Sequence, residues 1–396
     1  MRTRSMGLAL FSALAIVVSA CSTAATPTPA PTQAPTAAPP SSAESPAASA
    51  SAGASAGSSQ AAGTWKVGVV TDVGTLDDKN FNQFSFEGAE AGATAIGASS
   101  PPAIVPKDSS EYANDIQTFV DQGFNIIVTV GFNLATDTTK AAKKNPNVWF
   151  VGVDQSPICV DANGDPDTTF ACKGDAKTLL PKYISLQFAE DQAGYLAGIV
   201  AASISKVGKI GAIGGINSVP PVVRYIQGYT LGAQSVNPNI VVKTTYVSTS
   251  DFGKAFNDPK TGTAVATQFI KANGVDVLFQ VAGKTGNGVL DAACKANIMA
   301  IGVDVDQFLS YPAADACIWS SAEKHLSVAV AAAITAIAAG SATPGDNVYN
   351  ANNNGIGASP QHDKTWPSDL QSKLDAAVAA MKAGTLTTCP AKCGQP

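Results

Sequence analysis

Histidine is nearly absent from this sequence of 396 residues, which contains only His325 and His362. Imidazole is the commonest metal ligand and the usual general base, so its scarcity argues against histidine-based metal sites and Ser-His-Asp catalysis. The motifs GxSxG and HExxH are also absent, and no pair of carboxylates stands beside a histidine. We therefore expect a protein that is not an enzyme.

Charged residues are scarce as well. Asp, Glu, Lys and Arg make up 14% of the chain, and the net charge is −5. The sequence has no basic stretch with interleaved aromatic residues, which is the pattern typical of a nucleic-acid-binding surface. We therefore expect no nucleic-acid partner.

Two glycine-rich segments come close to nucleotide-binding motifs without completing them. Residues 211–216, GAIGGI, lack the GxGxxG spacing of a dinucleotide site. Residues 282–288, AGKTGNG, contain GKT, but Leu278 stands where a phosphate loop has its first glycine. These glycines indicate either tight strand-to-helix turns or a close approach of the main chain to a ligand, and no cofactor is expected.

The N-terminus has the pattern of an export signal, which we assign to residues 1–20. Arg2 and Arg4 precede an apolar run over 6–18 that is too short for a comfortable membrane span. The following VSAC, which ends at Cys21, resembles a bacterial lipobox, in which the leader is cleaved before a cysteine whose thiol carries lipid. The alternative is an ordinary signal peptide with an incidental cysteine. We predict a lipid anchor at Cys21 and a location on the cell membrane, facing the extracytoplasmic side.

Residues 21–63 consist almost wholly of Ala, Ser, Thr, Pro and Gly after the cysteine. Such a segment lacks the bulky apolar side chains that offset the entropy of ordering, and its prolines favour extended polyproline II. We predict a disordered, fairly stiff tether between a lipid and a folded domain that works near a membrane.

Six cysteines remain: Cys159, Cys172, Cys294, Cys317, Cys389 and Cys393. An even number in an exported protein favours disulfides, and six allow fifteen pairings. Sequence proximity favours Cys159–Cys172 and Cys389–Cys393, which leaves Cys294–Cys317. Zinc is the competing interpretation, but no second CxxC-type pair and no nearby histidine completes four ligands.

From Thr64 onward, apolar runs of strand length alternate with amphipathic helical segments. The predicted strands are 65–70, 124–131, 147–154, 183–188, 209–216, 240–247, 276–283 and 299–306. Continuous apolar strands that are each followed by a helix indicate parallel sheets covered on both faces. Because the strands exceed what one small sheet normally holds, we expect two α/β lobes that share a cleft.

Polar residues gather directly after these strands, where ligands of open parallel sheets bind. The loop after the first strand is the richest: Asp72, Asp77 and Asp78 precede Phe81 and Asn82. The acids could hold a divalent cation or could cap the following helix. Phe81 could fasten that helix to the sheet, or could form a stacking platform for a planar ligand beside the amide of Asn82.

Several segments, in order, resemble the basic membrane protein family, whose purine nucleoside-binding lipoproteins serve ABC importers. They are TDVGTLDDKNFNQFSFEG (71–88), VGFN (130–133), EDQAGYLAGIVAA (190–202), KIGAIGG (209–215), QVAGKTGNGV (280–289), AIGVDVDQ (300–307) and SSAEKH (320–325). The resemblance spans about residues 65–345.

The family implies a type I periplasmic-binding-protein fold, with two Rossmann-like lobes of parallel sheets joined by a three-crossover hinge. The N-terminal lobe would comprise 64–187 and 308–345, and the C-terminal lobe 188–307 and 346–396. The chain would cross near residue 188, return near 308–317, and cross again near 346 to form a last strand.

In similar nucleoside-binding proteins, the base lies between aromatic rings and is recognised by an Asn and an Asp, while the ribose hydroxyls meet an Asp and a Lys. The resemblance implies a base side of Phe81, Asn82 and Asp137, with Phe279 as the second ring. It implies a ribose side of Asp304 and Lys324. Gly283 would allow close main-chain approach, and Asp72 would lie in the loop that frames the site.

The expected function is capture of a nucleoside, with a purine favoured, by a monomer that presents it to an ABC permease. A flavin, a sugar or a signalling molecule on the same scaffold is one alternative, in a transporter or in a sensor. A surface-anchored nucleoside hydrolase is another, and its metal site or acid–base pair would have to come from the aspartates near Asp72 and Asp304.

Overall fold

Residues 65–395 are described by a computed structural model, and all of them belong to one compact unit. The predicted leader, Cys21 and the tether lie outside the described residues. Within 65–395 the strands form two six-stranded sheets, and no helix there has the length and apolar character needed to cross a bilayer.

The first sheet has the strand order β11-β5-β4-β3-β1-β2, with every pair parallel. Its strands are β1 (Val67–Val70), β2 (Ala103–Ile104), β3 (Ile126–Val130), β4 (Trp149–Val153), β5 (Tyr183–Phe188) and β11 (Gly345–Tyr349). Its helices are α1 (Phe81–Ala95), α2 (Tyr112–Asp121), α3 (Ala135–Lys144), α4 (Ala176–Leu179) and α11 (Leu326–Ala338), with a short 3-10 turn η1 (Phe132–Leu134). Residues of β1 and β3 are buried throughout, as expected of a sheet covered on both faces.

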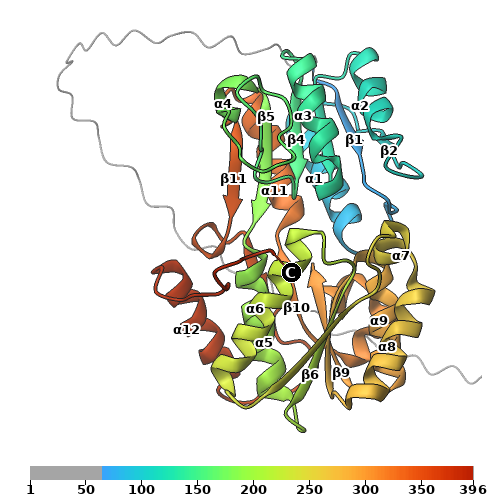
Figure 1. Ribbon diagram of the computed structural model, residues 1–396, viewed down its shortest axis with the longest axis vertical. Coiled ribbons are helices and arrows are strands. Elements are labelled where there is room, and N and C mark those ends of the chain that lie inside the picture. Colours follow the sequence, from blue (N-terminus) through green and yellow to red (C-terminus); the bar gives the residue numbers. More distant parts are fainter. Residues whose placement is uncertain (1–64, 396) are drawn as a thin grey trace, which may run out of the picture. The chain divides into compact units, whose positions relative to one another are not determined.

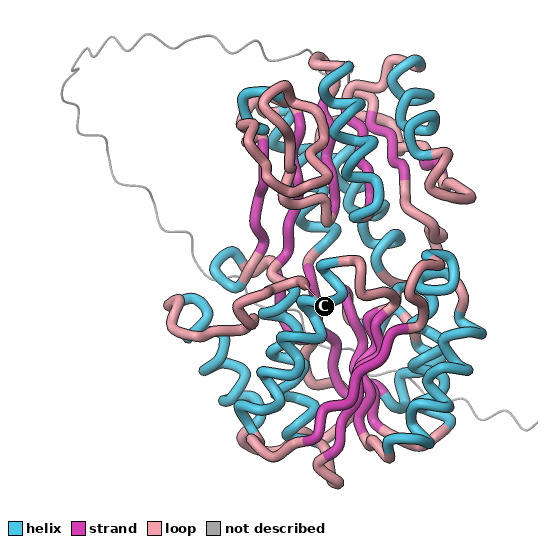
Figure 2. The backbone as a smooth tube through the Cα atoms, in the orientation of Figure 1, coloured by secondary structure: helices cyan, strands magenta, loops and turns pink. Residues whose placement is uncertain are grey.

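The second sheet has the order β12-β10-β9-β8-β6-β7, and its one antiparallel pair is β10 with β12. Its strands are β6 (Lys209–Gly214), β7 (Val241–Tyr246), β8 (Val277–Val281), β9 (Met299–Asp304), β10 (Ile318–Lys324) and β12 (Ile356–Ala358). Its helices are α5 (Glu190–Ile204), α6 (Pro220–Val236), α7 (Phe252–Asn257), α8 (Pro259–Asn273), α9 (Gly283–Lys295), α10 (Gln307–Ser310) and α12 (Leu370–Lys382), and η2 (Pro312–Cys317) and η3 (Ala351–Asn353) are 3-10 turns. Helices α5 and α6 cover one face of this sheet, and α8 and α9 cover the other (Figures 1 and 2).

The chain passes between the sheets three times, at places that partly differ from the prediction. It leaves the first sheet after β5, as expected, but it returns only between β10 and α11, not at 308–317. The missed strand β10 contains buried Ser320 and Ser321, which the search for apolar runs does not detect. The hydroxyl of Ser320 donates to the Ser359 carbonyl, and the Ser321 amide donates to the Ser359 hydroxyl, so these polar groups are satisfied inside the sheet.

The last crossing is also corrected. The segment predicted to give one final strand in the second lobe instead gives two strands. Strand β11 extends the first sheet beside β5, and β12 pairs with β10 in the second sheet. The crossing therefore lies between residues 349 and 356 rather than near 346.

Helices α5 and α6 touch backbone to backbone. A Cβ added at Gly194 would lie 2.2 Å from the Tyr225 carbonyl oxygen, and one added at Gly198 would lie 2.1 Å from the Tyr229 oxygen. Only glycine allows the two helix backbones to approach so closely. This close packing fixes the position of the first turns of α6, which face the candidate site described below.

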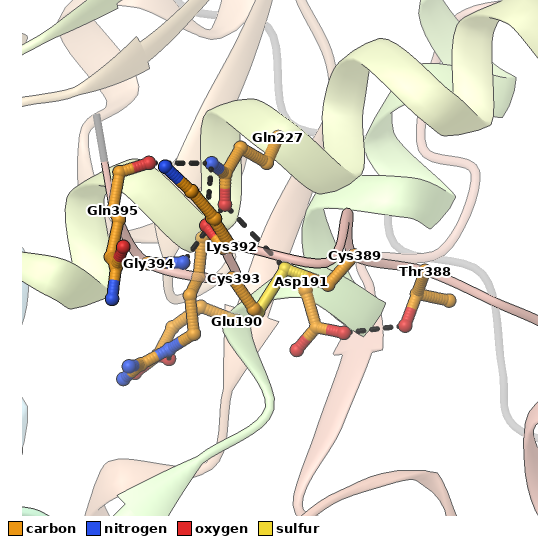
Figure 3. The surroundings of a disulfide bond; sticks show 10 residues. Glu190, Asp191, Gln227, Thr388, Cys389, Lys392, Cys393, Gly394 and Gln395 are labelled. Atoms are coloured by element: carbon orange, nitrogen blue, oxygen red, sulfur yellow. Dashed lines mark hydrogen bonds and ion pairs between the residues drawn. A yellow bond between two sulfur atoms is a disulfide. The ribbon is translucent and has the colours of Figure 1, made fainter.

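The six described cysteines form three disulfides, the two that sequence proximity favoured and the one that those two left over. They are Cys159–Cys172, Cys294–Cys317 and Cys389–Cys393. Figure 3 shows the third, which closes a short loop beside Asp191 and Gln227 near the end of the described chain. The Gln227 side chain binds that loop through the Gly394 amide and the Gln395 carbonyl.

Candidate ligand-binding site

One cavity collects side chains from both sheets at the carboxyl ends of their strands. The empty space between its walls is about 670 Å³, a volume that includes space open to solvent. Its aromatic lining consists of Phe81, Phe132, Tyr225, Phe252 and Phe256, and its ionisable lining of Asp72, Asp78, Asp154, Asp304 and Lys324. The cavity therefore combines planar apolar walls with a few convergent polar groups.

Most of the predicted site residues lie around this cavity. Asp72, Phe81, Asn82, Gly283, Asp304 and Lys324 all line it. Phe81 is the first residue of α1, Asp304 ends β9 and Lys324 ends β10, so the loop after one sheet meets two strand ends of the other. Phe81 and Asp304 thus share one hollow, although they lie far apart in the sequence.

Two predicted residues are elsewhere. Asp137 lies in the first turn of α3, outside the cavity lining, with its carboxylate 3.6 Å from the Lys140 ammonium. Phe279 is fully buried in β8 and stacks on Tyr229 with ring centroids 5.0 Å apart. Phe279 therefore packs in the core behind the site rather than facing a ligand.

The cavity also contains residues that the sequence prediction did not assign to it, chiefly Asp154 and Tyr225. Asp154 follows β4 directly, in the position after a strand where ligand-binding groups collect, so this signal was available in the sequence. Tyr225 had no such signal, because it lies in the middle of an amphipathic helix and reaches the cavity through the packing of α6 on α5.

Lys324 is the centre of the polar side of the cavity. Its ammonium lies 2.5 Å from Asp154, 3.4 Å from Asp304 and 3.7 Å from Glu190. Burial by itself lowers the pKa of Lys324, but the attraction of Asp154, Asp304 and Glu190 raises it above its ordinary value. Lys324 is therefore a charged ammonium that three carboxylates share.

Asp154 and Asp304 have matching roles in the two lobes. Asp154 directly follows a strand and Asp304 ends one, and both residues have a left-handed backbone, with φ of 60° and 64° respectively. This conformation costs energy in residues other than glycine and is found at functional sites. Burial raises the pKa of Asp154 to about 7, opposed by Lys324, and burial likewise raises the pKa of Asp304. The Tyr225 hydroxyl donates to Asp304 over 3.2 Å.

The start of α1 forms a neighbouring part of the cavity wall and contacts Lys324 directly. The Phe81 ring centroid lies 4.7 Å from the Lys324 ammonium, within the range of a cation–π contact. The Asp78 carboxylate accepts hydrogen bonds from the Asn80, Asn82 and Gln83 amides, so it caps α1, which was one of the two roles considered for these acids.

Two acids near the start of α1 have altered proton affinity. Burial raises the pKa of Asp78 to about 6 despite its three backbone hydrogen bonds. Burial also raises the pKa of Asp72 to about 7, although a hydrogen bond with the Asn82 side chain opposes this increase.

The Asn82 Oδ1 atom and the Asp154 Oδ1 atom are buried and accept no hydrogen bond from the described residues. Both residues line the cavity, and these two oxygen atoms are themselves covered by the surrounding protein.

Side chains of the types that bind metals come together at one place in residues 65–395, at Asp191, Cys389 and Cys393. The two sulfur atoms belong to the disulfide in Figure 3, so neither is a thiolate ligand. Within the described chain, the zinc interpretation of this cysteine pair is therefore wrong.

Solved structures share the fold. An ABC transporter system solute-binding protein from Aeropyrum pernix K1 aligns with a TM-score of 0.67 at 22% identity, over 82% of this chain and 92% of that one. Another, from Conexibacter woesei DSM 14684, aligns with a TM-score of 0.60 at 24% identity, over 82% and 98% of the two chains. The fold is thus the two-lobed α/β fold of periplasmic solute-binding proteins, as predicted.

Sequence comparison gives the family. The profile described as "ABC transporter substrate-binding protein PnrA-like" matches residues 65–379. The Lactococcus lactis subsp. cremoris protein named "ABC transporter nucleoside-binding protein BmpA" is 30% identical over 253 residues, 61% of this chain and 64% of that relative. The chain therefore spans just under two thirds of the length of this curated relative. It belongs to the PnrA-like family of ABC transporter substrate-binding proteins, which confirms the resemblance seen in the sequence.

Proposed function

We propose that this protein captures nucleosides, with a purine as the preferred base, and hands them chemically unchanged to the permease of an ABC importer. The observation that carries the proposal is one cavity lined by Phe81 and Asn82 from the first lobe and by Asp304 and Lys324 from the second. The name of the Lactococcus lactis relative, a nucleoside-binding protein, supports this ligand class.

The base is held by rings and an amide. Phe81 stacks on one face of the heterocycle, and Phe132, Phe252 or Phe256 supplies the second wall. Asn82 reads the edge of the base, because its unpartnered Oδ1 atom accepts a hydrogen bond that a purine N–H donates.

The ribose is held by the carboxylates around Lys324. A diol donates both protons to one carboxylate in two charge-assisted hydrogen bonds, each worth about 1.5–3 kcal/mol. Asp304 accepts the two hydrogen bonds of the ribose diol. The Oδ1 atom of Asp154, which has no partner among the described residues, accepts a hydrogen bond from a further hydroxyl. Contacts to both lobes favour the closed form, so binding and lobe closure are linked.

The place of action follows from the N-terminus of the sequence. The protein is anchored through lipid at Cys21, works as a monomer on the extracytoplasmic face of the cell membrane, and meets its permease there. The segment over 21–63 is the tether that gives the binding lobes their reach.

Calorimetric titration of the purified protein tests the proposal. Inosine, guanosine and adenosine are titrated beside uridine, riboflavin, D-ribose and D-allose. We expect the purine nucleosides to bind more tightly than the other ligands by tenfold or more. Tight binding of riboflavin or a sugar, with no heat from any nucleoside, would overturn the proposed ligand class.

A second measurement separates capture from hydrolysis. The protein is incubated with inosine and calcium, and the mixture is analysed by chromatography for hypoxanthine. We expect intact inosine at every time point. Release of free base that scales with protein concentration would identify a nucleoside hydrolase instead.

A further inference from the structure

The second lobe holds the loop between β1 and α1 at three points. The Lys284 ammonium donates to the Thr75 hydroxyl over 2.9 Å and lies 3.1 Å from Asp77. The other two contacts are to main-chain carbonyls: the Asn287 amide donates to Asp78 over 3.0 Å, and the Ser310 hydroxyl donates to Lys79 over 2.8 Å. Lys284, Asn287 and Ser310 are not part of the cavity lining.

This loop determines where the base side of the site lies. The backbone of Lys79 is left-handed at φ 64°, and the Asp78 carboxylate caps the first turn of α1 with three hydrogen bonds. Phe81 and Asn82 are the first two residues of that helix. A shift of residues 75–79 therefore moves the ring and the amide that face the ligand.

Buried side-chain amides connect Asn287 to the strand end that carries Asp304. The Gln280 side chain donates to Gln307, and the Gln307 side chain donates to Asn287 over 3.2 Å. Gln307 also accepts from the amide of Val303, the residue before Asp304. Gln280 and Gln307 are fully buried and Asn287 is 5% exposed, so this chain of amides has no water to compete with its hydrogen bonds.

We propose that Lys284, Asn287 and Ser310 form a loop clamp, a set of positioning residues that closes the two lobes around the ligand without touching it. The clamp holds residues 75–79 in the place that α1 needs, and Asn287 links this loop to the strand end that carries Asp304. The inference rests on the proposed function for its ligand, and it adds residues that set affinity from outside the cavity.

The clamp is polar and modest in strength, which suits a protein that must reopen. The Lys284 side chain is 26% exposed and its partner Asp77 is 73% exposed, so that ion pair is mostly solvated. A neutral hydrogen bond changes affinity by about two- to tenfold when it is lost. The two neutral hydrogen bonds and the solvated Lys284 contact bias the lobes towards closure without locking them.

Matched variants test the clamp. Asn287→Ala and Ser310→Ala remove its two main-chain contacts, and Lys284→Ala removes its exposed contact with little risk to folding. Asn273→Ala and Ser235→Ala are the controls, because their side chains make equivalent hydrogen bonds to the Phe269 and Gly232 carbonyls within the second lobe. Each protein is titrated with inosine, and its hydrogen–deuterium exchange over residues 75–83 is measured with and without inosine.

We expect the clamp variants to bind inosine about three- to tenfold more weakly, mainly through faster dissociation, and to exchange faster over 75–83. The controls should stay within twofold of the wild type in both measurements. Inosine affinity within twofold of wild type in all three clamp variants would overturn the clamp. If the wild-type protein binds no nucleoside, the proposed function fails, and the clamp is judged by exchange without ligand: unchanged rates over 75–83 in the three variants overturn it.

Discussion

Replacement of Asp304 by asparagine changes the ribose side of the site while leaving its backbone intact. Asp304 has φ 64°, and asparagine adopts this left-handed conformation more readily than most residues. The new side chain can still accept a hydrogen bond from the Tyr225 hydroxyl, and Lys324 keeps Asp154 as its nearest partner. Asp304→Asn should therefore fold normally.

The magnitude follows from the number of acceptor atoms. A carboxylate accepts from both hydroxyls of a ribose diol, whereas the asparagine amide accepts from one and presents an N–H₂ donor to the other. The loss of one charge-assisted hydrogen bond, about 1.5–3 kcal/mol, corresponds to about 10- to 150-fold in affinity.

Calorimetry with inosine and 2′-deoxyinosine measures the effect. The wild type should prefer inosine, and Asp304→Asn should bind inosine at least tenfold more weakly and lose most of that preference. Asp137→Asn is the control, because this carboxylate pairs with Lys140 outside the cavity. If Asp304→Asn keeps wild-type affinity and the same preference for inosine, Asp304 does not hold the diol and the reasoning fails.

Three further predictions concern charge, pH and packing. Inosine 5′-monophosphate should bind at least about 100-fold more weakly than inosine in the same titration, because its phosphate would approach a cavity with four aspartates and one lysine; equal affinity would show that this charge does not govern selection. Because burial raises the pKa of Asp72 to about 7 and of Asp78 to about 6, the native state binds more protons than the unfolded state above pH 4, and stability falls as pH rises to 7. The ligand-free protein should therefore melt at a higher temperature at pH 5 than at pH 8, and a flat profile would contradict these pKa values. Gly194→Ala should destabilise the protein by about 1–3 kcal/mol in urea denaturation, because a Cβ would lie 2.2 Å from the Tyr225 carbonyl; Gly253→Ala, where a Cβ meets nothing closer than 3.4 Å, is its control, and equal stability of the two variants would refute the close packing of α5 on α6.

The parts of the fold that the sequence predicted are those driven by continuous apolar burial. Strands such as β1, β3 and β8 are buried along their whole length, so their composition alone identifies them. Strand β10 was missed because its buried serines are satisfied by Ser359, a residue 38 positions away from Ser321 that no local pattern reveals. That one omission also moved the predicted crossing between the lobes.

The candidate site likewise contains residues that the sequence could predict and residues that it could not. Residues at strand ends and at the first turn of α1 could be predicted, because the parallel sheets bring those points to one edge. Asp137 and Asp154 both follow a strand, but Asp137 lies on α3 and the turn of that helix directs it to Lys140. The sequence could not separate the two, since the direction of a helical side chain depends on where the helix begins. The resemblance to the family implied Phe279 as the second ring, but Phe279 lies two residues before the end of strand β8, where its ring stacks on Tyr229 in the core.

The most direct test of nucleoside capture is the identity of the small molecule that leaves the purified protein when it is denatured. Mass spectrometry of the released material should detect an intact nucleoside, and a purine nucleoside above all. A flavin, a sugar, or a free base in place of the nucleoside would contradict the account.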